Sequence, residues 1–293
     1  FLIIFFIGTK YYKDFGVYGD EPYHRWIGSI YYSYYKELIF SFDLNNKYIV
    51  EIIELSKHEY FRFWVVYPVF FDLFTEFLAD ILNIKSTKGI FEIRHLTNFL
   101  FFFLSLIFFY KLILLRFKNY YLALLGVVFV FLSPRIFAES FYNSKDILFL
   151  SFSIINIYFS INFIKSQNNR NLILYSLSTG LLIQSRIMGL IFPILTFLII
   201  LLEATNKKIL KDKFIKIILS LFIIFFTVFL FWPFMWIDFA KHLPFYFEFL
   251  QHLAGPYTNL YLGETILSNN TPWHFKFVWI SITVPESILI FGL

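Results

Sequence analysis

The chain has 293 residues, of which 59% are hydrophobic and only 15% are charged, and its mean hydropathy of +0.68 excludes an ordinary water-soluble domain. The net charge of +5 is modest, and its concentration in a few loops fits orientation across a membrane better than nucleic-acid binding. Cysteine is absent, which excludes disulfides and thiolate metal sites. We therefore expect an integral membrane protein with no nucleic-acid partner.

The chain starts within an apolar run, residues 1–7, which we interpret as the end of a truncated first membrane span. It ends within another apolar run, so we expect a fragment that is truncated at both ends. A bilayer crossing needs roughly 20 apolar residues. Further spans are predicted at residues 93–115, 120–132, 147–164, 214–231 and 277 to the C-terminal end.

The stretch GDEPYHRWIG follows the first run and places two adjacent carboxylates, Asp20 and Glu21, close to the imidazole of His24. In a helix, Asp20 and His24 are spaced i, i+4, so they would share a face and could act on one ligand. The same residues also suit an ordinary helix start, with Asp20 as N-cap and Pro22 in the first turn. The region 8–92 as a whole predicts amphipathic helices at the membrane interface.

Residues 63–82 are long enough to cross a bilayer, but they carry Asp72, Glu76 and Asp80 at strict i, i+4 spacing. A helix would align these three carboxylates on one face, and lipid cannot solvate such a column. We therefore expect an interfacial or re-entrant helix here instead of a span.

Residues 172–202 are too long for one crossing and short for two, with Arg186 near the centre. A turn at Arg186 would bring its charge to the membrane surface. The basic loops near residues 116–118, 165–170 and 207–213 share one side only if 172–202 crosses twice and 63–82 does not cross. The sequence therefore predicts cytoplasmic basic loops. The loops 8–92 and 233–276, the turn 133–146 and the turn at Arg186 are expected on the opposite side.

Candidate functional residues gather on that opposite side in four sets. These are Asp20, Glu21 and His24; Arg135, Glu139, Asn143, Lys145 and Asp146; Arg186; and Glu264 with His274. Acids that serve as general bases, beside cations that hold a phosphate, indicate group transfer. Each set has a simpler alternative. Lys145 and Asp146 could be a helix-start pair, Arg186 could contact head groups, and Glu264 could be a plain loop residue. The histidines lack metal-binding spacing, so no metal site is expected.

Seven motifs occur in a recognisable order: GDEPYHRWIG, VVYPVFFDLF, EIRHLTNF, RFKN, SPRIFAESFYNSKDILF, QSRIMGLIFP and NNTPWHFKFVW. Together they resemble the membrane glycosyltransferases of the C-type fold, specifically the protein O-mannosyltransferase and aminoarabinose-transferase-like branch. No single motif is specific to this family. The order of the seven motifs, and the side of the membrane predicted for each, are specific when taken together. One departure is Tyr67, because the family often has Lys or His before this Pro.

The resemblance implies an inverting transferase that moves a sugar from a polyprenyl-phosphate donor, its co-substrate, to a hydroxyl group of a protein, lipid or glycan. Asp20 would take the acceptor's proton, and Glu21 would position the acceptor or tune Asp20. Arg186, with Lys145, would bind the donor phosphate. The supporting or acceptor-binding residues would be His24, Asp146, Asn143 and Glu264. No cofactor is firmly implied, and a divalent cation is not indicated.

The expected fold is all-α, a polytopic multi-span helical bundle with amphipathic juxtamembrane helices in the first external loop. We expect one transmembrane glycosyltransferase domain over residues 1–293, with external loops at 8–92 and 233–276. The implied location is a bacterial inner membrane, with the active site facing outward. Two alternatives stay open. One is a transporter or flippase, for which the expected internal repeats are not found, and the other is a non-catalytic scaffold or polymer-ligase-like protein.

Overall fold

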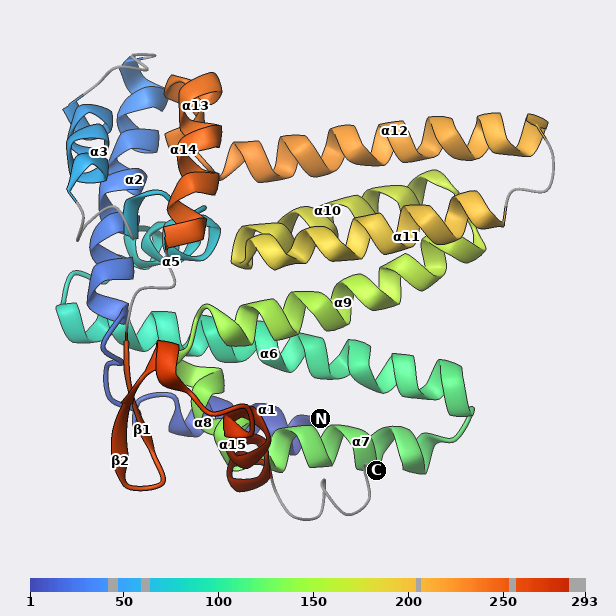
Figure 1. Cartoon of the computed structure of the whole chain (residues 1–293), viewed down its shortest axis with the longest axis horizontal. Helices are drawn as coiled ribbons and strands as arrows, with labels where there is room; N and C mark the ends of the chain where they lie inside the picture. The colour runs from blue at the N-terminus through green and yellow to red at the C-terminus, as the bar shows by residue number, and fades with distance from the viewer. Residues whose placement is uncertain (42–46, 59–63, 204–206, 253–256, 285–293) are drawn as a thin grey trace.

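The structure is a computed structural model that describes residues 1–41, 47–58, 64–203, 207–252 and 257–284. Its long helices extend along the longest axis of the molecule (Figure 1). They are α6 (Thr87–Phe117), α7 (Tyr120–Leu132), α9 (Asp146–Lys165), α10 (Asn169–Ser185), α11 (Ile191–Leu202) and α12 (Lys207–Leu230). Among the described residues, α6, α9 and the Lys211–Leu230 part of α12 are each long and apolar enough to cross a membrane. The expected all-α, polytopic membrane fold is confirmed.

Shorter elements gather at one end of the long helices, on the left of Figure 1. They are α2 (Glu21–Ser41), α3 (Lys47–Lys57), α5 (Phe70–Ile81), α8 (Pro134–Tyr142), η1 (Ile187–Leu190), α13 (Phe234–Ile237), α14 (Phe239–His252), β1 (Thr258–Tyr261), β2 (Glu264–Leu267), η2 (Ser268–Asn270) and α15 (Phe275–Thr283). The first helix, α1 (Leu2–Tyr11), packs against α6. This loop-rich end therefore contains the described parts of both large loops, 8–92 and 233–276.

The course of the long helices agrees with the distribution of basic loops. The ends of α6, α9 and α11 and the start of α12 all lie on the right of Figure 1, so the basic residues of 116–118, 165–170 and 207–213 share this side. The chain reverses at Arg186, between α10 and η1, at the loop-rich end. Residues 172–202 thus form two helical segments that run in opposite directions, as their length and the central arginine predict.

Helix α5 has only 12 residues and does not cross the bundle, as its acids predict. Each acid meets a cation from a neighbouring helix. The pairs are Asp72 with Arg94 at 2.7 Å, Glu76 with Arg25 at 4.0 Å, and Asp80 with Lys36 at 3.0 Å. Gly28 lets α2 come close to α5, because a Cβ atom there would lie 2.8 Å from the Cβ of Asp72. Protein groups therefore solvate the carboxylates that lipid could not.

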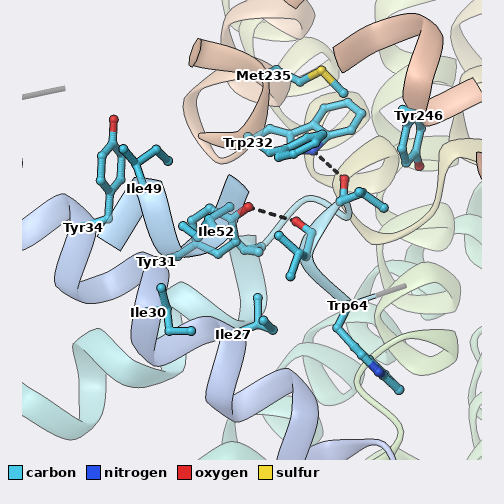
Figure 2. Packing of buried hydrophobic residues seen from close by; sticks show 14 residues of the cluster. Ile27, Ile30, Tyr31, Tyr34, Ile49, Ile52, Trp64, Trp232, Met235 and Tyr246 are labelled. Atoms are coloured by element: carbon cyan, nitrogen blue, oxygen red, sulfur yellow. Dashed lines mark hydrogen bonds between the residues drawn. The ribbon is translucent and has the colours of Figure 1, made fainter. Parts of the chain in front are cut away.

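A buried apolar cluster fixes the segment before α5 (Figure 2). Tyr31 of α2 donates a hydrogen bond to the carbonyl oxygen of Val65 at 2.9 Å. The indole N–H of Trp232, after α12, donates to the carbonyl oxygen of Val66 at 2.9 Å. The backbone next to Tyr67 is thus held from both sides, which positions this side chain at the loop-rich end.

Two regions differ from the expectation. Most of 133–146, expected as a turn, is the helix α8, which bends by 67° from α7 because Pro134 starts a new helix. The loop before the last expected span contains the antiparallel hairpin β1–β2, whose turn uses the positive φ angles of Leu262 and Gly263. Of that last expected span, residues 285–293 lie outside the described part of the chain.

Removing one partner of the Arg94–Asp72 pair should destabilise the protein strongly. The two side chains are 0% and 5% exposed, so Arg94→Leu leaves a buried carboxylate without its cation, at a cost of about 3–5 kcal/mol. Thermal unfolding of the detergent-purified protein should show a clearly lower midpoint. The matched control is Lys36→Leu, which breaks a half-exposed pair and should cost less than about 1 kcal/mol. Equal shifts in the two variants would contradict the assigned role of the buried pair.

Candidate functional site

Three segments that are distant in sequence enclose one cavity at the loop-rich end. They are the start of α2, the turn between α8 and α9, and the end of α10. The cavity has a volume of about 220 Å³. Its lining residues are Tyr18, Asp20, Glu21, His24, Tyr67, Tyr142, Asn143, Ser144, Lys145, Asp146, Ser185 and Arg186. Of the candidate residues from the sequence, Asp20, Glu21, His24, Asn143, Lys145, Asp146 and Arg186 are brought together here. Arg135, Glu139, Glu264 and His274 do not line the cavity.

Asp20 lies immediately before α2, and its carbonyl oxygen accepts the N–H of His24 at 3.1 Å. The helix start that the sequence suggested is therefore present, and it coexists with a place in the cavity. Partial burial raises the pKa of the Asp20 carboxyl above its ordinary value, although the positive charge of Lys145 opposes this. A carboxylate with a raised pKa is a stronger proton acceptor, which suits a general base.

Glu21 is buried and firmly held, in contrast to its neighbour Asp20. Its Oε2 atom accepts a hydrogen bond from the backbone N–H of Tyr18 at 3.0 Å and lies 3.1 Å from Nε2 of His95. The side chains of Glu21 and His95 are each 3% exposed. Two adjacent acids thus have very different surroundings, and Asp20 is the more accessible of the two.

His24 lines the same cavity wall as Asp20, as the i, i+4 spacing predicts, but it is buried. Its Nδ1 lies 3.7 Å from Oδ2 of Asp72. Burial, reinforced by the positive charges of Lys145 and Arg94, lowers the pKa of His24 to about 3 even though Asp72 opposes the shift. His24 is therefore a neutral imidazole at physiological pH and adds no positive charge to the cavity.

Lys145 brings its ammonium group to the cavity from the α8–α9 turn. The Nζ atom lies 5.4 Å from the centroid of the Tyr67 ring, a cation–π contact. Burial and the nearby charges of Arg186 and Arg94 lower the pKa of Lys145, while Asp72 and Asp20 oppose the shift. Tyr67 thus contacts a lysine from another segment and contributes no charge of its own.

Arg186, at the turn after α10, forms an ion pair with Asp146. Both side chains are partly exposed, at 43% and 57%. Asn143 orients this pair, because its Nδ2 donates to Oδ2 of Asp146 at 3.0 Å and its Oδ1 accepts the N–H of Asp146 at 3.0 Å. Asp146 thus links Arg186 to the α8–α9 turn, which also carries Lys145.

The cavity therefore combines an accessible carboxylate with two cationic side chains from other segments. Such a set can accept a proton at one point and stabilise a negatively charged leaving group at another. Glu264 lies on β2, exposed, and does not line this cavity. In the described residues no group of three or more His, Asp and Glu side chains is placed to hold a metal ion.

Sequence reasoning missed several residues around the cavity. Tyr18 and Tyr142 stack on each other at a centroid distance of 5.8 Å, and tyrosine is too common in this chain to single them out. The Arg94–Asp72 pair, which contacts the cavity residue His24, was also missed. The sequence did contain a signal for this pair. An acid that cannot face lipid needs a cationic partner, and the motif EIRHLTNF contains the arginine that provides it, Arg94.

The comparisons with known proteins identify a family. Residues 67–232, more than half of the chain, match the family model described as dolichyl-phosphate-mannose-protein mannosyltransferase. The matched region includes Lys145 and Arg186 and begins after Asp20. No curated protein and no solved structure matches the chain.

The neutral state of His24 predicts a stability that depends on pH. The folded state keeps His24 unprotonated down to about pH 3, whereas the unfolded chain takes up a proton near 6.5. The stabilisation is therefore complete above pH 6.5 and is lost as the pH falls toward 3, by up to about 1.4 kcal/mol per pH unit. Thermal unfolding at about pH 7.5 and about pH 5 should show a larger fall for the unaltered protein than for His24→Gln. The same fall in both proteins would show that His24 is not held neutral.

Proposed function

Because the chain belongs to the dolichyl-phosphate-mannose-protein mannosyltransferase family, we propose that it transfers a sugar to a hydroxyl group of a protein, lipid or glycan, with inversion at the anomeric carbon. A member of this family is a multi-pass membrane glycosyltransferase whose donor is a sugar on polyprenyl phosphate. The observation that carries the proposal is the cavity in which Asp20 lies with Lys145 and Arg186. The acid supplies a base, and the cations match the phosphate of the donor.

Asp20 accepts the proton of the acceptor hydroxyl as the hydroxyl oxygen forms a bond to the anomeric carbon. The bond between this carbon and the phosphate oxygen breaks on the opposite side, and its electron pair stays on the phosphate. The raised pKa of Asp20 supports this role, since a base is most effective when its pKa lies closer to the working pH. His24 is buried and neutral with a pKa of about 3, which makes it a much weaker candidate.

Arg186 and Lys145 bind the donor phosphate and stabilise the charge that develops on it as it leaves. Polyprenyl phosphate needs no protonation near neutral pH, so one base suffices. Asp146 holds Arg186 at the cavity, and Asn143 holds Asp146. Glu264, expected to support the site, has no place in this mechanism because it lies outside the cavity.

We place the cavity on the outward face of a bacterial inner membrane. The basic loops lie at the other end of the long helices, and positively charged loops are usually cytoplasmic. The acceptor would then reach the cavity from the side where secreted and surface molecules are found.

Asp20→Asn should abolish most of the sugar transfer and leave donor binding nearly intact. The substitution removes the proton acceptor without changing the size of the side chain, and losing a general base typically lowers the rate by a factor of about 100 to 10,000. The measurement is turnover of a labelled polyprenyl-phosphate sugar by the purified protein in lipid. The matched control is Asp14→Asn, an exposed acid outside the cavity, which should keep full activity. Equal turnover by the Asp20→Asn variant and the unaltered protein would remove Asp20 as the base.

Arg186→Ala should weaken donor binding by roughly ten- to thirtyfold, about 1.4–2 kcal/mol. The effect is kept small because Arg186 is 43% exposed and is not a fully buried partner. Binding of the unlabelled donor can be followed by competition or by fluorescence quenching. The control is Arg135→Ala, an arginine with a similar exposed fraction of 53% that pairs with Glu139 and does not line the cavity. Equal weakening in both variants would point to general surface charge.

A further inference from the structure

His95 connects the long helix α6 to the start of α2 through Glu21, which lines the cavity. The residue is buried, with 2% of its surface exposed. Its Nε2 lies 3.1 Å from Oε2 of Glu21, and its Nδ1 lies 3.3 Å from the carbonyl oxygen of Tyr12. His95 itself does not line the cavity, so any effect on the reaction must pass through Glu21.

Hydrogen-bond donors and acceptors can be counted at this contact. The Tyr12 carbonyl only accepts, so Nδ1 of His95 must carry a hydrogen to bond it. Its other ring nitrogen, Nε2, is within hydrogen-bond distance of Oε2 of Glu21, so the ring is held at both nitrogens. The Glu21 carboxylate is therefore engaged by His95, whereas Asp20 beside it lines the open cavity.

The same carboxylate of Glu21 also closes the turn that carries Asp20. The N–H of Tyr18 donates to Oε2 of Glu21 at 3.0 Å, and the N–H of Glu21 donates to the carbonyl oxygen of Tyr18 at 3.0 Å. Asp20 lies between these two residues in the chain. Both of these side-chain contacts of Glu21 involve Oε2. The contact with His95 therefore also stabilises the turn that contains the backbone of Asp20.

We propose that His95 is a positioning residue for sugar transfer: it anchors Glu21, and Glu21 holds the turn that aims Asp20 into the cavity. This inference rests on the proposed function. The charged residues near His95 on its own helix have other partners, since Arg94 bonds Asp72 and Glu92 lies 3.8 Å from Lys13. Glu21 is therefore the acidic side chain that His95 contacts and positions.

The first test separates His95 from ordinary buried polar residues. His95→Leu should lower kcat by about ten- to a hundredfold with little change in the KM for the donor, because Asp20 is misaligned while Arg186 and Lys145 stay in place. His95→Gln should recover part of the rate, since its amide N–H can still donate to Glu21. The matched control is Asn156→Leu, which removes a fully buried polar side chain that bonds Ser178 and Thr179 on α10 and does not line the cavity.

The coupling between His95 and Glu21 gives a second readout. In a Glu21→Gln background, His95→Leu should cause little further loss, because residues that act through one contact are not additive. The inference is overturned if the two losses multiply independently. It is also overturned if His95→Gln is no better than His95→Leu, or if Asn156→Leu lowers kcat as much.

Amide hydrogen exchange tests whether His95 stabilises the turn at Asp20, and it does not depend on an assay of sugar transfer. In His95→Leu the backbone amides of Tyr18 and Glu21 should exchange at least about tenfold faster, while Asn156→Leu leaves them unchanged. Unchanged exchange in His95→Leu would overturn the inference even if the enzyme is active. Absence of turnover by the unaltered protein with every donor tested would instead sink the proposed function, and the exchange result would still decide what His95 does.

Discussion

The buried ion pair between Arg94 and Asp72 is the constraint on which the loop-rich end depends. A guanidinium or a carboxylate left alone in this environment would cost several kcal/mol, so α5 and α6 can only pack in the register that joins them. Once α5 is fixed there, Gly28 allows α2 to approach it closely and brings His24 beside Asp72. The start of α2, with Asp20, is then placed next to the α8–α9 turn.

The cavity illustrates how surroundings assign different roles to similar groups. Asp20 and Glu21 are adjacent, yet one is open to the cavity and the other is tied to His95 and to the backbone of Tyr18. In the same way, Lys145 lies over an aromatic ring, whereas Arg186 is held by a carboxylate. The roles proposed for these residues, as base, support and phosphate ligand, follow from their surroundings more than from residue type.

The sequence predicted those features that follow from length, charge and the properties of lipid. The acids of α5 excluded a crossing, and Arg186 marked the reversal between α10 and α11, because both statements need only the cost of charge in hydrocarbon. The charged residues that line the cavity followed from motif order, whereas the lining tyrosines Tyr18 and Tyr142 did not. The partners of Glu21 did not, since His95 is 74 positions away and nothing local links them. The position of Glu264 on β2, outside the cavity, did not follow either, since the sequence does not show where a long loop folds back.

The order in which the pair Asp72 and Arg94 is synthesised bears on how the protein enters its membrane. Asp72 leaves the ribosome 22 residues before the arginine that neutralises it. Before Arg94 is present, α5 is a strongly amphipathic segment with carboxylates along one face. Such a segment is more stable at the bilayer surface than in the bilayer interior. Insertion of α6 delivers the cation, and the short helix can dock only afterwards. The pair therefore makes the final position of α5 depend on a helix that follows it in the chain.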